Sequence, residues 1–307
     1  MLGRAAGAVT SRVPRLVLEI GFGVVIGPSV LGFVSPTETT AHVADAGAAL
    51  LLFLVGMHVD TAAMRRVGRT ALSVAAVGIV APAVLGFLSG LMTGQPVRTS
   101  VFLGAALTAT SIGITARVFR DAGRLDTKTA QIVIGAAVVD DVVGLTLLAV
   151  VTLAVGSGEI PVLVTSALII GAFFVGALVS SSPKGPAVES VASGVGSVLV
   201  PLFFVHIGMR AEISSFSSVR VISVSTLILA VAMGSKLLSG WAAGGEGVDR
   251  IATGLAMAPR GEVGLIFAST ALESGAFDED MYAVVLLVVL ATTAITPILL
   301  RRRLAAP

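Results

Sequence analysis

Long runs of apolar residues recur along the chain, and short groups of charged and turn-forming residues separate them, such as SPTET at 35–39 and SSSPKGP at 180–186. A helix needs about 20 apolar residues to cross the roughly 30 Å hydrocarbon core of a bilayer, which is close to the length of each run. The pattern predicts ten transmembrane helices with no soluble domain between them. They cover residues 14–34, 41–58, 70–94, 99–118, 128–155, 160–181, 190–209, 219–244, 250–272 and 280–300.

The composition supports this interpretation. Of the 307 residues, 55% are hydrophobic and 12% are charged, and the mean hydropathy is +1.01. Soluble domains contain about 25% charged residues. We therefore expect an all-α polytopic membrane protein, surrounded by lipid and forming one transmembrane domain over residues 1–307. The basic residues lie in short loops, which argues against nucleic-acid binding, and the absence of cysteine excludes thiolate metal sites.

The positions of lysine and arginine predict the orientation in the membrane. Most of them fall in the N-terminal segment, in the loops after the second, fourth, sixth and eighth spans, and in the C-terminal tail. The opposite set of loops holds only Arg98, Arg210 and Arg220. Because cytoplasmic loops are enriched in basic residues, both termini are predicted to be cytoplasmic.

The two halves of the chain resemble each other at an offset of about 150 residues. LLFLVGMHVD at 51–60 corresponds to FFVHIGMRAE at 203–212, and GAALTATSIG at 104–113 corresponds to GLAMAPRGEV at 254–263. Each copy contains five spans, so the second must be inserted upside down. The sequence thus predicts two inverted repeats, over about 11–156 and about 160–303, an arrangement typical of secondary transporters.

Two adjacent carboxylates, Asp140 and Asp141, interrupt the span at 128–155 near its middle. Each acid at that depth costs roughly 2.5–3.5 kcal/mol on insertion scales, so the pair needs a partner, water or protons. A soluble buried helix with hydrogen-bonded acids is the alternative, which the composition disfavours.

The spans at 99–118 and 250–272 both contain a polar interruption at mid-depth. The first contains Thr108, Thr110 and Ser111, and the second contains Ala258-Pro259-Arg260-Gly261-Glu262. Unwound backbone at this depth is tolerated only where it is buried in protein or lines a cavity. For the first span alone, hydroxyls bonded back to their own helix are the simpler explanation. Two interruptions at matching repeat positions instead indicate two broken helices.

Three charged side chains accompany these breaks. Lys236 lies inside the span at 219–244, and a buried ammonium needs an acid, for which Asp140 or Asp141 is the natural partner. The alternative is a lysine that extends to the membrane surface. Arg260 and Glu262, beside Pro259, are interpreted as structural groups that pair with carbonyls of the break or with acids elsewhere.

These stretches together resemble a known family, the bacterial cation:proton antiporter-2 type of sodium/proton and potassium-efflux antiporters. The resemblance is carried by VLEIGFGVVIGPSVLG at 17–32, LLLFLVGMHVD at 50–60, LTATSIGITARVF at 107–119, IGAAVVDDVVGL at 134–145, PLFFVHIGM at 201–209 and GLAMAPRGEVGLIFA at 254–268. It implies the antiporter fold, with two crossed discontinuous helices in the spans at 99–118 and 250–272.

The resemblance also implies roles for the residues. Asp141 matches the carboxylate that binds the transported Na⁺, Asp140 its neighbour, and Lys236 the lysine that pairs with that neighbour. Thr108, Thr110 and Ser111 are expected to help coordinate the ion, with no resident cofactor. Complete relatives are expected to be homodimers. Relatives also carry a further N-terminal helix and one or two more spans where this chain has only the short connection at 156–160, so the chain resembles a shortened member.

The sequence therefore predicts a secondary antiporter, not an enzyme, in a bacterial plasma membrane. Protons would compete with a monovalent cation, Na⁺ or Li⁺ before K⁺, at the aspartate pair. Adjacent residues on one helix diverge by about 100°, which argues against an intramembrane aspartyl protease. A non-transporting protein on the same scaffold and a sodium-coupled symporter of related fold remain as alternatives.

Overall fold

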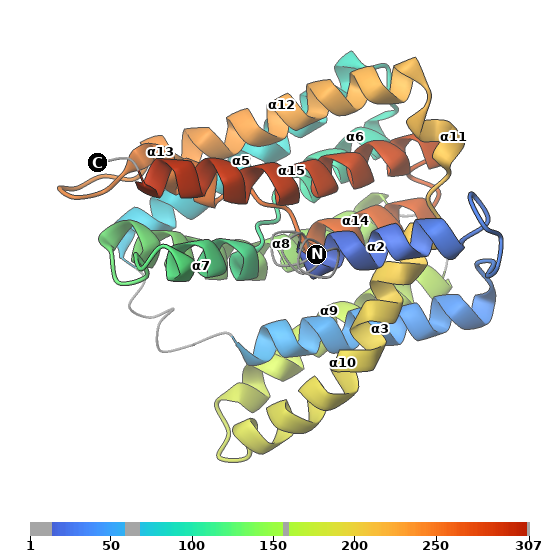
Figure 1. Cartoon of the computed structure of the whole chain (residues 1–307), viewed down its shortest axis with the longest axis horizontal. Helices are drawn as coiled ribbons and strands as arrows, with labels where there is room; N and C mark the ends of the chain where they lie inside the picture. Colours follow the sequence, from blue (N-terminus) through green and yellow to red (C-terminus); the bar gives the residue numbers. More distant parts are fainter. Residues whose placement is uncertain (1–13, 59–67, 156–159, 306–307) are drawn as a thin grey trace, which may run out of the picture.

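A computed structural model describes residues 14–58, 68–155 and 160–305, and throughout these ranges the only regular secondary structure is helical. Most of the helices lie roughly along the long axis of the molecule (Figure 1). In chain order they are α2 (Arg15–Ile26), α3 (Glu38–Met57), α5 (Arg69–Met92), α6 (Val97–Ala106), α7 (Ile112–Asp121), α8 (Lys128–Val155), α9 (Ile160–Ser180), α10 (Gly185–Met209), α11 (Ile213–Phe216), α12 (Val219–Trp241), α13 (Arg250–Ala256), α14 (Glu262–Glu273) and α15 (Glu279–Ala305).

The helices match the predicted spans closely. Seven of those in the described ranges are long and apolar enough to cross a membrane, namely α3, α5, α8, α9, α10, α12 and α15. The spans predicted at 99–118 and 250–272 each consist of two short helices, α6 with α7 and α13 with α14. The first span is shorter than predicted, because α2 ends at Ile26 and Pro28, which has no backbone N–H, follows at once.

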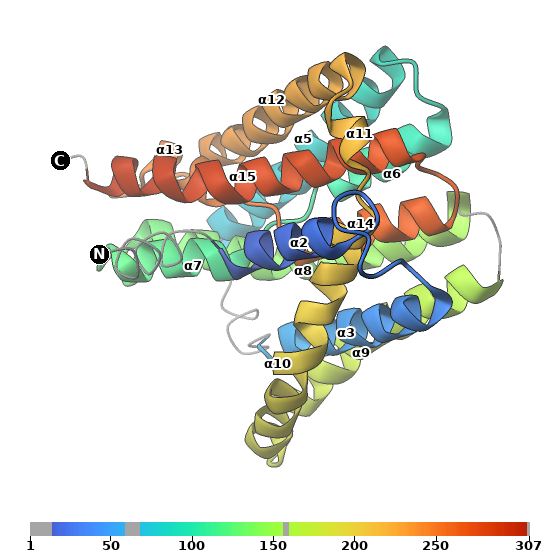
Figure 2. The same ribbon diagram turned by 45° about the vertical axis from the view of Figure 1, so that its right-hand side comes forward.

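The helices pack as two groups, visible in both views (Figures 1 and 2). In one group α3 packs against α9 and α10, and α10 also packs against α2. The other group contains the two broken helices together with α5, α8, α12 and α15. Helices α8 and α14 contact α9 and so join the groups. The broken helices therefore lie within one packed body and beside the second.

Glycines allow the closest helix crossings in the first group. A Cβ atom on Gly56 of α3 would lie 2.1 Å from a backbone oxygen of α9, and one on Gly176 of α9 would lie 2.1 Å from a backbone oxygen of α3. Gly23 of α2 and Gly208 of α10 face each other's helices in the same way, at 2.0 and 2.1 Å. Any side chain at these positions would force the backbones apart, so the two crossings depend on glycine.

The described connections gather at two ends of the molecule. The turns 122–127, 181–184 and 242–249 and the C-terminal end of α15 lie toward the left in Figure 1. The connections 27–37, 93–96, 210–218 and 274–278 lie toward the right. The loops that are rich in lysine and arginine thus share one end, which we call the basic end.

Candidate functional site

The two interruptions predicted from the sequence are true breaks that contact each other. Helix α6 ends at Ala106 and α7 begins at Ile112, while α13 ends at Ala256 and α14 begins at Glu262. The backbone N–H of Ser111 donates to the carbonyl of Pro259 at 2.9 Å. A Cβ atom on Gly261 would lie 2.8 Å from the Cβ of Ser111, so only glycine permits this approach.

Hydroxyl groups of the first broken helix satisfy carbonyls of the second. Thr110 donates to the carbonyl of Met257 at 3.1 Å, and Thr115 donates to that of Ala256 at 2.6 Å. Carbonyls at the end of a helix have no intrahelical partner, and none of these groups can reach bulk water. Side chains that bond across the crossing therefore make two open backbone segments compatible with a buried position.

Lys236 extends from α12 into the first break and is fully buried. Its Nζ donates to the carbonyl of Thr108 at 2.5 Å, to the hydroxyl of Thr110 at 2.8 Å and to Oδ2 of Asp140 at 3.2 Å. All three protons of the ammonium thus have an acceptor. The alternative that this lysine extends to the membrane surface is excluded by its burial.

The two neighbouring acids of α8 have different surroundings. Asp140 is fully buried, and its Oδ2 forms the ion pair with Lys236 while its Oδ1 lacks a hydrogen-bond partner among the described residues. Asp141 is 7% exposed and forms no salt bridge with any described residue. Asp140 therefore has a buried basic partner, whereas Asp141 has none among the described residues.

Arg260 ties the second break to the first. Its side chain is fully buried, and Nη1 donates to the carbonyl of Ala109 in the first break at 3.0 Å. Thr293 of α15 donates to the carbonyl of Arg260 and holds the backbone of the break. Reasoning from the sequence missed Thr293, although the pair Thr292-Thr293 in an apolar span was a signal. Glu262 begins α14, where the helix dipole favours an acid.

Two of the three candidate hydroxyl ligands, Thr108 and Thr110, already form hydrogen bonds. The Thr108 hydroxyl donates back to the carbonyl of Ala105 at 2.8 Å, and Thr110 accepts from Lys236. Ser111 is buried at the crossing. No three His, Asp or Glu side chains in the described ranges group as a metal site.

A cavity of about 790 Å³ leads from the basic end toward the crossing. It lies between α2, α7 and α15, with Ser111 and Glu262 among its lining residues. We call it the arginine cavity. Its remaining lining residues are Pro14, Arg15, Leu16, Gly113, Ile114, Arg117, Val118, Ala294, Pro297, Ile298, Arg301 and Arg302.

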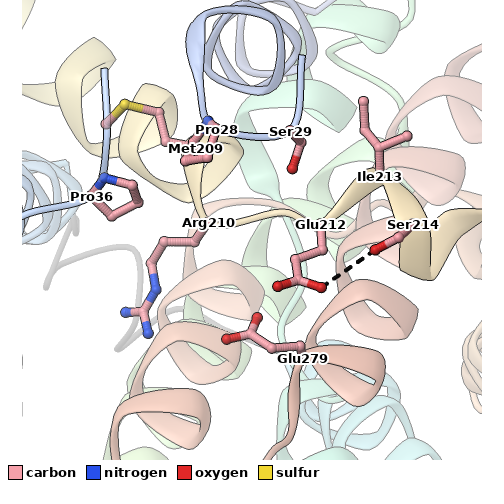
Figure 3. Close-up of a pocket in the computed structure, with 9 residues that line it drawn as sticks. All are labelled: Pro28, Ser29, Pro36, Met209, Arg210, Glu212, Ile213, Ser214 and Glu279. Carbon is pink, nitrogen blue, oxygen red and sulfur yellow. Dashed lines mark hydrogen bonds between the residues drawn. The ribbon is translucent and has the colours of Figure 1, made fainter. Parts of the chain in front are cut away.

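A second cavity, of about 610 Å³, lies at the opposite end, where α10 meets α11 and α15 (Figure 3). Glu212 and Glu279 extend toward each other across it, and Ser214 donates to the carboxylate of Glu212 at 3.4 Å. Arg210 extends to the other side and pairs with Glu273 of α14 at 3.4 Å. This ion pair joins the two helix groups on the side away from the arginine cavity.

Comparisons with known proteins agree with this arrangement. The family profile described as "Sodium/hydrogen exchanger, transmembrane" matches residues 2–168 and 162–305. The high-affinity Na⁺/H⁺ antiporter NhaS3 of Synechocystis is 32% identical to this chain. The alignment is 334 positions long and covers 88% of this chain and 72% of NhaS3. The Na⁺/H⁺-K⁺ antiporter GerN of Bacillus cereus is 28% identical to this chain. That alignment is 362 positions long and covers 97% of this chain and 92% of GerN.

The fold has a counterpart among solved structures. The sodium proton antiporter MjNhaP1 of Methanocaldococcus jannaschii superposes with a TM-score of 0.65 at 15% identity, over 97% of this chain and 92% of the other. The GerN alignment is longer than the 307 residues of this chain, which is therefore the shorter of the two. The two segments that match the family profile meet at 162–168, beside the short connection that the sequence analysis singled out.

Proposed function

Because the chain belongs to the sodium/hydrogen exchanger family of transmembrane transporters, we propose that it is a secondary antiporter that exchanges a monovalent cation for protons across a membrane. The names of two relatives, a Na⁺/H⁺ antiporter and a Na⁺/H⁺-K⁺ antiporter, support this reaction class. We favour Na⁺ or Li⁺ as the cation, with K⁺ as a further candidate.

The site of exchange in this proposal is the carboxylate of Asp141. The observation that carries it is the ion pair between Lys236 and Asp140 at the crossing of two broken helices. Since Lys236 neutralises Asp140, the adjacent Asp141 retains a negative charge that a proton or a small cation can neutralise. Carbonyls and hydroxyls of the first break, from Thr108, Thr110 and Ser111, supply the uncharged ligands. Arg260 and Glu262, on either side of Gly261, keep the crossing in place.

Exchange then follows from competition. A proton and a cation cannot both occupy the same carboxylate, so the arrival of one releases the other. The titrations of Asp140, Asp141 and Lys236 are coupled by their proximity. A cation bound at Asp141 would weaken the ion pair between Asp140 and Lys236. A proton then lost from Lys236 would be the second proton of the exchange.

The inverted repeats complete the mechanism that we propose, with one repeat over about 11–156 and the other over about 160–303. Their support is that corresponding glycines make corresponding contacts. A Cβ atom on Gly90 would contact Ser100, and a Cβ atom on Gly240 would contact Arg250. The two residues of the second pair each lie 150 positions after those of the first. Alternating access would arise when the group containing the breaks moves against α2, α3, α9 and α10.

The substitution Asp141→Asn tests the proposal, because it keeps the size of the side chain and removes the charge. We expect cation-dependent dissipation of a pH gradient in proteoliposomes for the wild type with Na⁺, Li⁺ or K⁺, and none for Asp141→Asn. Asp126→Asn, an exposed acid in the turn before α8, is the matched control and should transport normally.

Other outcomes identify the rival functions. Exchange that is unchanged in Asp141→Asn would refute the assignment of the site. Cation uptake without proton movement would indicate a symporter. An inactive wild type that retains its fold would indicate a non-transporting protein on this scaffold.

We further propose that the protein resides in a bacterial plasma membrane with the basic end and both termini in the cytoplasm. The support is the enrichment of lysine and arginine in the loops at that end. The resemblance to complete relatives also leads us to propose a homodimer, which cross-linking in the membrane would test.

A further inference from the structure

The arginine cavity combines charge and apolar surface in a way that transport of a cation does not require. Four arginines line it, Arg15, Arg117, Arg301 and Arg302, and all four side chains are exposed. An approaching cation is repelled by such a lining, whereas an anion is attracted. The single carboxylate of the lining, Glu262, lies at the crossing of the broken helices.

The arginines and the apolar residues occupy different levels of the cavity. On α15, Ala294, Pro297 and Ile298 are followed by Arg301 and Arg302 on the same face of the helix. At about 1.5 Å per residue, Arg301 lies roughly 10 Å nearer the basic end than Ala294.

The same order is found on α7. There Ile114 precedes Arg117, and the helix runs from the break toward the basic end. On these two walls apolar residues therefore lie between the basic end and the inner part of the cavity, where Ser111 and Glu262 are found.

Three of the arginines are available to a ligand. Arg301 pairs with Asp121 of α7 at 2.9 Å. Arg15, Arg117 and Arg302 form no salt bridge with any residue in the ranges that the structure describes.

We propose that the arginine cavity binds an anionic phospholipid. The phosphate would contact Arg117, Arg302 and Arg15, and an acyl chain would lie along the apolar wall formed by Ile114 and α15. A lipid is favoured over a soluble anion because apolar side chains in and beside the lining, on α15 and α2, are exposed. Ile298 is 54% exposed, Ile295 39% and Leu18 of α2 44%.

The position of the lipid gives it a regulatory role. Ser111 and Glu262 line the inner part of the cavity, so a bound lipid would stand between the basic end and the crossing of the broken helices. Binding itself does not depend on ion exchange. The inference can therefore be tested separately from the proposed function.

The test measures binding of phosphatidylglycerol and phosphatidylcholine with the same fluorescent acyl chain to the purified full chain in detergent, by fluorescence anisotropy. We expect phosphatidylglycerol to bind more tightly. The triple variant Arg15→Gln, Arg117→Gln, Arg302→Gln should weaken its binding by about tenfold or more, because each arginine near an anionic headgroup contributes to binding.

The matched control removes the same charge at the same end. Arg120, Arg124 and Lys184 are exposed and do not line the cavity, so their replacement by glutamine should leave binding unchanged. Equal binding of the two lipids, or equal loss in both triple variants, would overturn the inference. Competition by excess inorganic phosphate as effective as that by unlabelled lipid would instead indicate a soluble anion and would also overturn it.

A second variant tests the apolar wall with every arginine in place. Ala294 is exposed within the cavity, so Ala294→Trp fills the space without disturbing the core. We expect weaker phosphatidylglycerol binding and an unchanged melting temperature. Unchanged lipid binding would show that no acyl chain occupies the cavity.

Discussion

At the scale of single residues, the site depends on charges that the bilayer cannot solvate. Lys236 and Asp140 are fully buried and 3.2 Å apart. Removing one partner of a buried ion pair leaves the other charge unpaired, which typically costs about 3–5 kcal/mol. The ion pair is thus a requirement of the folded state as well as a candidate part of the transport cycle.

This leads to a prediction about stability. Lys236→Met should destabilise the protein by about 3 kcal/mol or more because Asp140 loses its counter-ion. The double variant Lys236→Met, Asp140→Asn should recover most of the loss, since neither charge then remains. Thermal unfolding in detergent, followed by intrinsic fluorescence, measures both effects.

Lys128→Met is the control for this prediction. Lys128 is exposed and, among the described residues, its ammonium donates only to the carbonyl of Glu246 at 3.3 Å, so its replacement should leave the melting temperature unchanged. A melting temperature of Lys236→Met equal to that of the wild type would show that the ion pair does not stabilise the fold.

Residue-level reasoning from the sequence succeeded where a side chain was conspicuous in its segment. Lys236 stands out as a lysine within an apolar span, and Asp140 and Asp141 are conspicuous for the same reason. Thr293 was missed because a threonine in a membrane helix normally bonds to its own helix, as Thr292 does with the carbonyl of Val288. Only the packed structure brings Thr293 to the carbonyl of Arg260.

At the scale of the helices, the limits of α8 at Lys128 and Val155 agree with the predicted span 128–155, because apolar length determines them. The two breaks were also predicted, from Pro259 and from clustered hydroxyls. The first span was predicted too long. Its apolar residues continue past Ile26, and hydropathy does not register that Pro28 ends the helix.

The glycine crossings give the second stability prediction. Gly56→Ala should destabilise the protein by about 1–3 kcal/mol or more, because the new Cβ would lie 2.1 Å from the carbonyl oxygen of Phe173 and push α3 from α9. Thermal unfolding in detergent measures the loss.

Gly171→Ala on the same helix pair is the matched control. Apart from the backbone of its own helix, no atom of the described residues lies within 4 Å of a Cβ built at Gly171, so this variant should match the wild type or be slightly more stable. Equal stability of Gly56→Ala and Gly171→Ala would contradict the close crossing of α3 and α9.

At the scale of the whole molecule, the loops collect at two ends of opposite character. The basic end holds most of the lysines and arginines, and the other end carries the cavity with Glu212 and Glu279. The arginine cavity leads inward from the basic end, and the Arg210–Glu273 ion pair joins the helix groups at the other.

The proposed orientation predicts which loops can be labelled from outside the cell. The chain contains no cysteine, so Ser181→Cys and Ser217→Cys each introduce a single thiol, one at either end. Both positions are exposed. A membrane-impermeant maleimide should label Ser217→Cys in intact cells and Ser181→Cys only after lysis. The reverse pattern would place the basic end outside.

The sequence by itself determined the class of protein, the limits of most of its long apolar helices and the location of the two breaks. These properties depend on local hydropathy and on the conformational limits of proline and glycine, which a bilayer enforces segment by segment. The sequence also indicated that Lys236 needs an acidic partner, but the pattern of residues left Asp140 and Asp141 as equal candidates for that partner.

Only the tertiary structure decided which groups meet. Lys236 reaches Asp140 across 96 positions of the chain and the carbonyl of Thr108 across 128. The arginine cavity likewise combines side chains of α2, α7 and α15 that no local pattern relates. Such contacts depend on how helices cross. A crossing is determined by packing between segments that are distant in the sequence, so the hydropathy of a single segment does not predict it.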